Sequence, residues 1–200
     1  MLDSSCYDRP DALKFIMTPP LREKKNNALL WEGIERGEVD TIGTDHCAFN
    51  YMEQKQLGAG DYRKCPGGAP GVETRMPILF GKGVIGGRIT PNRFAEITAT
   101  TPAKLFGMYP QKGVIAVGSD ADLVLMARRD ITIVNGLLHE NVDYTPYEGI
   151  RPMAWPTMTI SRGEIIARAD PESGLMSLTG GAGRGRFMKR GRFDEILSKA

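Results

Sequence analysis

Apolar residues in the first half of the chain recur at the spacing of an amphipathic helix. The clearest case is residues 23–37, EKKNNALLWEGIERG, where Gly37 is placed to end the helix. The apolar positions that share one face are Ala28, Leu29, Trp31 and Ile34. An apolar run at residues 39–43 follows and predicts a buried strand. This order of helix, short turn and strand is typical of a layered enzyme fold that is built from βαβ units.

Two further helices are predicted near the middle of the chain, at residues 74–81 (TRMPILFG) and 90–107 (TPNRFAEITATTPAKLFG). In the second segment, Thr90 and Thr101 each place a capping hydroxyl before a proline at the first helical position, and Gly107 is a stop signal. The side chains expected to face a core are Phe94, Ile97 and Leu105. Residues 50–71 form a long polar, glycine-rich stretch, and a loop of this length inside a compact domain is typically functional.

After residue 112 the apolar pattern changes from helix-like to strand-like. Residues 113–127 hold two short apolar runs around a turn at residues 118–120, and residues 158–169 read as a hairpin that turns at Arg162 and Gly163. The chain is therefore expected to be α/β. Its predicted parts are helix and strand units at 1–112, a β module at 113–170 and a tail rich in glycine and arginine at 171–200, which is expected to dock on a partner subunit.

Composition narrows the classes of partner. With 200 residues, 41% of them hydrophobic and 25% charged, the chain is large enough for one or two ordinary domains. A net charge of +2 does not favour nucleic acid as a partner, because such binding needs clustered, uncompensated basic residues. No apolar run reaches the roughly 18 residues of a membrane span, and no secretory signal is visible. We expect a cytoplasmic protein without a membrane partner, and its three cysteines should be reduced thiols.

The candidate chemistry is concentrated in VDTIGTDHCAFN, residues 39–50, where Asp45, His46 and Cys47 follow the predicted strand. Barrel enzymes place catalytic groups at the ends of such strands, and a carboxylate there can bind a metal ion or carry a proton. Asp45 could equally cap a turn. We expect His46 to be a supporting loop residue, Cys47 to be a small packed residue and His139 to be structural or at the surface. The chain has only these two histidines, so a histidine-rich metal site cannot be built from it alone.

Two glycine-rich motifs have weaker claims to function. GKGVIG at residues 81–86 matches the dinucleotide-binding pattern in its letters, but it follows a helix-like segment instead of a strand. GGAGRGR in the tail lacks the Gly-Lys-Ser/Thr ending of a phosphate-binding loop. Acidic residues interrupt the basic tail, so RNA binding is a poorer explanation than subunit docking.

Seven segments together carry a family resemblance. They are TPPLREK (18–24), TIGTDHCAFN (41–50), KQLGAGDY (55–62), GGAPGVETRMPILF (67–80), TPAKLFGMYPQKGVIAVGSDADLVL (101–125), NVDYTPYEG (141–149) and SRGEIIAR (161–168). With these segments the chain resembles the C-terminal part of dihydropyrimidinases and D-hydantoinases of the amidohydrolase superfamily. Allantoinases and dihydroorotases share the fold, but the sequences DHCAFN and GVETRMP are more similar to those of the dihydropyrimidinases and D-hydantoinases.

The resemblance implies the C-terminal portion of a metal-dependent (β/α)8 barrel hydrolase, followed by part of a β-sandwich domain. In that family two zinc ions bridged by hydroxide open the amide ring of a dihydropyrimidine or a 5-substituted hydantoin. One aspartate binds metal and shuttles the proton, and by motif match it is Asp45. The family also holds the ring through main-chain groups, at positions that correspond to Thr18 and Thr74. Both positions carry other side chains in the family, a change that could alter how the ring fits.

The other family metal ligands have no counterpart in this sequence, which contains no His-x-His pair and no matching lysine or further histidines. We therefore expect the chain alone to bind no pair of zinc ions and to be inactive. Two explanations remain: the C-terminal piece of a genuine hydrolase, or a non-catalytic oligomerising scaffold like the collapsin response mediator proteins. Asp45 favours the hydrolase, because the scaffold relatives lack this aspartate. The resemblance also implies a homo-oligomer, or pairing with an N-terminal barrel piece.

Overall fold

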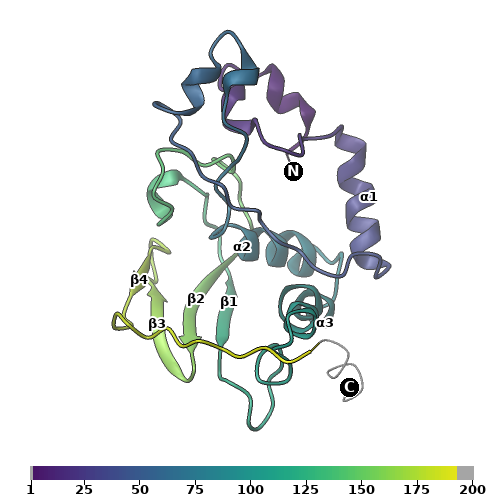
Figure 1. Cartoon of the computed structure of the whole chain (residues 1–200), viewed down its shortest axis with the longest axis vertical. Coiled ribbons are helices and arrows are strands. Elements are labelled where there is room, and N and C mark those ends of the chain that lie inside the picture. The colour runs from purple at the N-terminus through teal and green to yellow at the C-terminus, as the bar shows by residue number, and fades with distance from the viewer. Residues whose placement is uncertain (1, 193–200) are drawn as a thin grey trace.

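The computed structural model describes residues 2–192, and helices form where the apolar pattern predicts them (Figure 1). The helix α1 (Lys24–Glu35) ends before Gly37, whose φ of 81° is easily reached only without a side chain. Ile34 is buried as expected, but Leu29 is 55% exposed, so the predicted apolar face is only partly covered. No helix within residues 2–192 has the length and apolarity needed to cross a membrane.

Both central helices contain wide turns; the first extends beyond its predicted end, whereas the second lies within its predicted range. The first is α2 (Arg75–Leu79), continued by the π-helix η5 (Phe80–Ile85). The second is α3 (Pro91–Ala95), π-helix η6 (Glu96–Thr100) and α4 (Thr101–Leu105). Thr90 caps this helix as predicted, since its hydroxyl accepts from the Arg93 N–H at 3.1 Å.

The prediction that Thr101 is a capping residue is wrong, because Thr101 has helical φ and ψ within a continuous helical run. Pro102 cannot donate the usual backbone hydrogen bond, and the wide turn just before it accommodates that loss. Phe94 and Ile97 are buried as expected. Leu105 is 45% exposed, contrary to prediction, because it lies in the last turn at the helix end.

The predicted strand at residues 39–43 is not a hydrogen-bonded strand. Among residues 2–192 no other strand lies beside it, and a parallel barrel strand depends on neighbouring strands for its hydrogen bonds. Arginine side chains bind its carbonyls instead: Arg93 Nη2 reaches the Val39 oxygen at 2.6 Å, and Arg75 Nη1 reaches the Ile42 oxygen at 2.5 Å. The segment therefore stays extended without the hydrogen bonds of a β-sheet.

Within residues 2–192, five short 3-10 helices complete the helical elements. They lie at Ser4–Asp8 (η1), Ala12–Phe15 (η2), Lys55–Gly58 (η3), Tyr62–Lys64 (η4) and Asn135–Leu137 (η7). The long loop at residues 50–71 is thus partly ordered by η3 and η4. In Figure 1 this loop folds back against η1 and η2 at the top of the molecule.

The β module is one antiparallel sheet in the order β1-β2-β3-β4 (Figure 1). Its strands are β1 (Leu123–Arg128), β2 (Ala154–Ser161), β3 (Glu164–Ala169) and β4 (Met176–Leu178). The predicted hairpin turn is confirmed, because Arg162 and Gly163 both have positive φ between β2 and β3. The first apolar run after residue 112 forms no strand, and Ile115 is 86% exposed, since no described strand pairs with it.

The tail is only partly separate from the core. β4 lies inside the predicted tail and pairs with β3, so that part of the prediction is wrong. The following segment runs across the molecule to the helices (Figure 1), where the Gly191 N–H donates to the Gly107 oxygen at 2.7 Å. The last part of the predicted tail, residues 193–200, lies outside the described residues.

The helix α2 contributes side chains to both buried apolar clusters, one among the helices and one beside the sheet. One buried cluster contains Ile34, Leu79, Ile89, Phe94 and Ile97, and a second contains Ile78, Ile131, Ile133, Leu137 and Trp155. Gly81, just after α2, makes a close backbone approach: a β-carbon there would lie 1.4 Å from the Pro152 oxygen, just before β2. Only glycine fits that contact, and it fixes the distance between helix and sheet.

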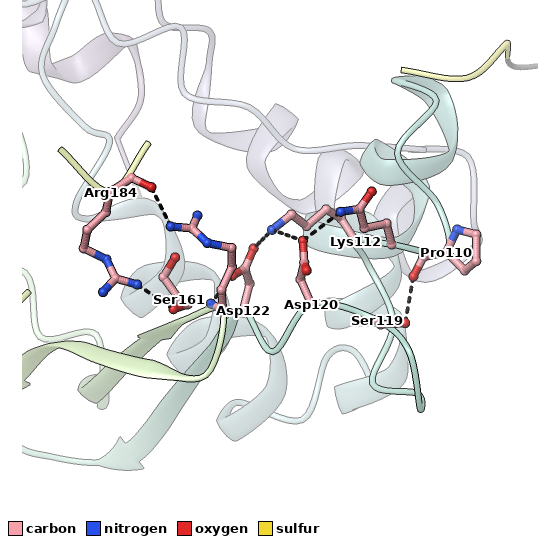
Figure 2. Close-up of polar contacts among 9 residues, drawn as sticks. Pro110, Lys112, Ser119, Asp120, Asp122, Ser161 and Arg184 are labelled. Carbon is pink, nitrogen blue, oxygen red and sulfur yellow. Dashed lines mark hydrogen bonds and ion pairs between the residues drawn. The ribbon is translucent and has the colours of Figure 1, made fainter. Parts of the chain in front are cut away.

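A network of charges fastens the same two parts on another side (Figure 2). Lys112, which follows α4, forms ion pairs with Asp120 at 2.8 Å and with Asp122, just before β1. Asp122 also accepts from the Arg162 N–H at 2.7 Å. The hydrogen bond from Lys112 lowers the pKa of Asp120. Burial raises the pKa of Asp122, but the bonds from Lys112 and Arg162 outweigh it and lower the pKa overall.

Replacing Lys112 by methionine should lower the denaturant midpoint near neutral pH. Both aspartates have a folded-state pKa below the ordinary 3.8, so the stability they contribute is present above pH 3.8 and is lost as the pH falls further. The difference between the native chain and Lys112→Met should therefore shrink from pH 7 to pH 3, as urea unfolding at both values would measure. The matched control is Lys189→Met at an exposed position. A difference that is equal at both pH values would contradict the proposed pairing.

Candidate active site

Asp45 lies where the sequence placed it, at the end of the extended segment 39–44. Its φ of 45° is left-handed, a conformation that aspartate tolerates better than most residues but that still indicates a constrained turn. The residue is exposed. The carboxylate is therefore available to a ligand, held on a sharp turn between two extended stretches.

The residues after Asp45 tie this turn to a neighbouring loop. His46 Nδ1 accepts from the N–H groups of Gly71 at 3.1 Å and Val72 at 3.3 Å, so this nitrogen carries no proton in this arrangement. The Cys47 N–H donates to the Ala69 oxygen at 3.3 Å. His46 is thus the supporting loop residue that was expected. The prediction for Cys47 is wrong, because its side chain is exposed where the loop runs over the surface.

Thr74 and Thr18 lie on either side of the same glycine-rich loop. Thr74 is completely buried, and its hydroxyl donates to the Gly71 oxygen at 3.2 Å, so its side chain is occupied within the protein. Thr18 is exposed and contacts the loop at Gly67, where an added β-carbon would lie 3.2 Å from the Thr18 Oγ1. The loop 66–72 therefore brings together the segments of Asp45, Thr18 and Thr74.

Sequence reasoning missed an acidic pair behind this loop. Glu140 has a side chain only 1% exposed; its Oε1 accepts from the Glu73 N–H at 3.2 Å and lies 3.7 Å from His46 Nδ1. Its Oε2 has no partner among the described residues. Glu73 in turn contacts His139 Nδ1 at 2.9 Å, and this hydrogen bond raises the pKa of His139. His139 is at the surface, as predicted. The sequence signal that could have pointed to the missed acidic pair is the set of acidic residues after His139 in LLHENVDY.

An apolar hollow of about 270 Å³ opens beside the turn that carries Asp45. Its walls come from α1, from residues 42–44 and from α2, and the side chains that line it include Trp31, Ile34, Arg75, Ile78 and Tyr147. Arg75 Nε is buried there without a hydrogen-bond partner among the described residues. The hollow is thus mainly apolar, and the few polar residues in its lining include Asn27, Thr44 and Arg75.

The residues present do not by themselves fit a metal centre. Within residues 2–192 no group of three or more histidine, cysteine, aspartate or glutamate side chains could hold a metal ion. Asp45 offers one carboxylate, and in the adjacent histidine one ring nitrogen, His46 Nδ1, already accepts from two N–H groups. No catalytic step can therefore be assigned to a metal ion from this chain alone.

Comparison with known proteins places this geometry in context. The chain is 45% identical to D-phenylhydantoinase of Escherichia coli O81 (strain ED1a) over 194 residues, 96% of this chain and 41% of that protein. Its structure matches a dihydropyrimidinase from Brevibacillus agri NCHU1002 with a TM-score of 0.87 and 44% identity, over 95% of this chain and 41% of that one. A D-hydantoinase (dihydropyrimidinase) from Thermus sp. matches with a TM-score of 0.87 and 40% identity over 95% and 41%.

The matched relatives fix the fold. The chain spans about two fifths of the length of the curated relatives it matches. It is the C-terminal portion of an amidohydrolase (β/α)8 barrel followed by part of a β-sandwich, in agreement with the prediction from sequence. The sequence profile of the amidohydrolase family matches residues 15–166. The chain belongs to the amidohydrolase family.

Proposed function

We propose that this chain supplies the C-terminal barrel units of a hydrolase that opens cyclic amide rings. The observation that carries the proposal is the position of Asp45, an exposed carboxylate on a constrained turn, tied to the loop that also contacts the segments of Thr18 and Thr74. The high identity to a D-phenylhydantoinase supports hydantoins with an apolar 5-substituent, and the match to a dihydropyrimidinase supports the six-membered ring.

The proposed role of Asp45 is proton transfer. Ring opening adds the oxygen of water to the ring carbonyl carbon and breaks the carbon–nitrogen bond, so one proton must leave the attacking oxygen and one must reach the departing nitrogen. A single carboxylate can accept the first and deliver the second. Main-chain groups at Thr18 and Thr74 would orient the ring. The Thr74 oxygen already accepts from the Ile78 N–H at 3.1 Å, so a ligand would share that oxygen through its second lone pair.

The domain organisation follows from the same proposal. Residues 1–112 would complete a barrel, residues 113–170 would extend a β-sandwich, and residues 171–200 would contact another subunit. Two apolar surfaces support a need for further chain: the hollow beside Asp45 and the exposed run around Ile115. The part of the E. coli relative that this chain does not match is the natural candidate to cover both.

The proposal is tested by co-expressing this chain with the unmatched part of the E. coli D-phenylhydantoinase; we call the purified pair the assembled enzyme. We expect it to open D-5-phenylhydantoin or dihydrouracil, followed by the loss of ring absorbance. The control is the unmatched part expressed alone. A stable assembled enzyme that opens neither ring would refute the hydrolase and leave a scaffold as the better explanation.

A further inference from the structure

Lys55 is a charged residue buried at the centre of the long loop. The whole residue is 0% exposed, whereas lysine is almost never fully buried unless it is paired. Among residues 2–192 no carboxylate forms an ion pair with it. Its ammonium instead donates to two main-chain oxygens, those of Ile16 at 2.6 Å and Pro66 at 2.8 Å, and it lies 5.8 Å from the centre of the Phe49 ring.

The arrangement is unfavourable for the charge itself. Burial lowers the pKa of Lys55, and a buried ammonium loses most of its hydration. An apolar side chain of similar length would fill the space without that cost. It would leave two carbonyl oxygens with fewer partners, however, and those oxygens belong to segments that are far apart in the sequence. The contacts made by the ammonium therefore account for a lysine here better than core packing does.

Those contacts join the three segments that build the candidate active site. Ile16 lies two residues before Thr18, and its oxygen also accepts from the Gly68 N–H at 3.2 Å. Phe49 lies four residues after Asp45. Gly68 packs closely against the segment that follows Asp45: a β-carbon at Gly68 would lie 2.4 Å from the Cys47 oxygen. Lys55 is thus at the junction between the Thr18 segment, the Asp45 segment and the loop between them.

We propose that Lys55 is a positioning residue: its ammonium holds the main chain at Ile16 and Pro66, and thereby keeps Thr18 in the orientation that binds the cyclic amide. This inference rests on the proposed function, because it concerns the ring-binding role of Thr18. The ammonium does not touch the substrate. Its loss should weaken ring binding and leave proton transfer at Asp45 largely intact.

The test is Lys55→Met in the assembled enzyme, with steady-state kinetics on D-5-phenylhydantoin. Losing charged hydrogen bonds to both oxygens should raise KM about tenfold or more, while kcat changes less than about threefold. Lys55→Gln, which keeps a neutral donor, should give an intermediate KM. Lys64→Met, at an exposed lysine of the same loop, should change neither constant.

Each other outcome has a defined meaning. An unchanged KM, or a fall in kcat alone, would overturn the positioning role, and so would failure of both Lys55 variants to fold, since stability would then explain the lysine. If the unsubstituted assembled enzyme opens no ring, the proposed function fails by itself. Hydrogen exchange of the Gly68 amide in the 200-residue chain then decides the structural part: it should be faster in Lys55→Met than in Lys64→Met, and equal rates would overturn it.

Discussion

Asp45→Asn should lower the kcat for ring opening in the assembled enzyme by about a thousandfold, within the range of general acid–base catalysis. The amide has the size of the carboxylate but cannot accept a proton at neutral pH. Asparagine also tolerates the left-handed backbone of residue 45, where φ is 45°, so the turn should keep its shape. KM should change little, because the ring is held by main-chain groups elsewhere. Initial rates over a range of substrate concentrations would measure kcat and KM, and a thermal midpoint for each variant would show that it is folded.

The matched control for this substitution is Asp40→Asn, five residues earlier in the same extended segment and also exposed. It removes the same charge from the same region and should leave kcat unchanged. If folded Asp45→Asn kept more than about a tenth of the native kcat, another group would have to carry the proton, and the proposed role of Asp45 would be wrong.

The second large effect concerns zinc. The purified 200-residue chain should retain no pair of zinc ions after dialysis, because Asp45 offers a single carboxylate and His46 Nδ1 is occupied by the Gly71 and Val72 N–H groups. The assembled enzyme should retain both ions of a two-metal site, since the missing ligands are expected on the added part. Elemental analysis of the two samples measures the difference directly. Two zinc ions per isolated chain would refute the prediction.

Local elements followed from the sequence where a single segment decides its own structure. The periodicity at 23–37 and the Arg162-Gly163 turn are such cases, since a helix face and a two-residue hairpin depend mainly on neighbours in the chain. The apolar run at 39–43 is the opposite case. Its composition is that of a strand, but a strand also needs a partner, and none is present among the described residues.

The sequence supplied the candidate residues of the site but not the contacts that hold them in place. Asp45, Thr18 and Thr74 came from motifs, and their roles stay predictions. That His46 accepts two main-chain N–H groups, or that Lys55 is buried against two carbonyl oxygens, depends on how residues 16–18 and 66–72 meet in space. No periodicity or spacing in the sequence records that meeting. Cys47 shows the same limit, because its exposure depends on the path of the loop.

The ion pairs of Lys112 have a consequence for building chimeras between relatives. The boundary proposed at residue 112 looks like a natural crossover point, yet the side chain beside that boundary is bound to Asp120 and Asp122 across it. Gly81 and Pro152 form a second contact that spans the same junction. A recombinant that takes its helices from one parent and its sheet from another must therefore keep both partners of each contact compatible. The pairs of contacting positions, and not the boundary at residue 112 alone, decide which crossovers are tolerated.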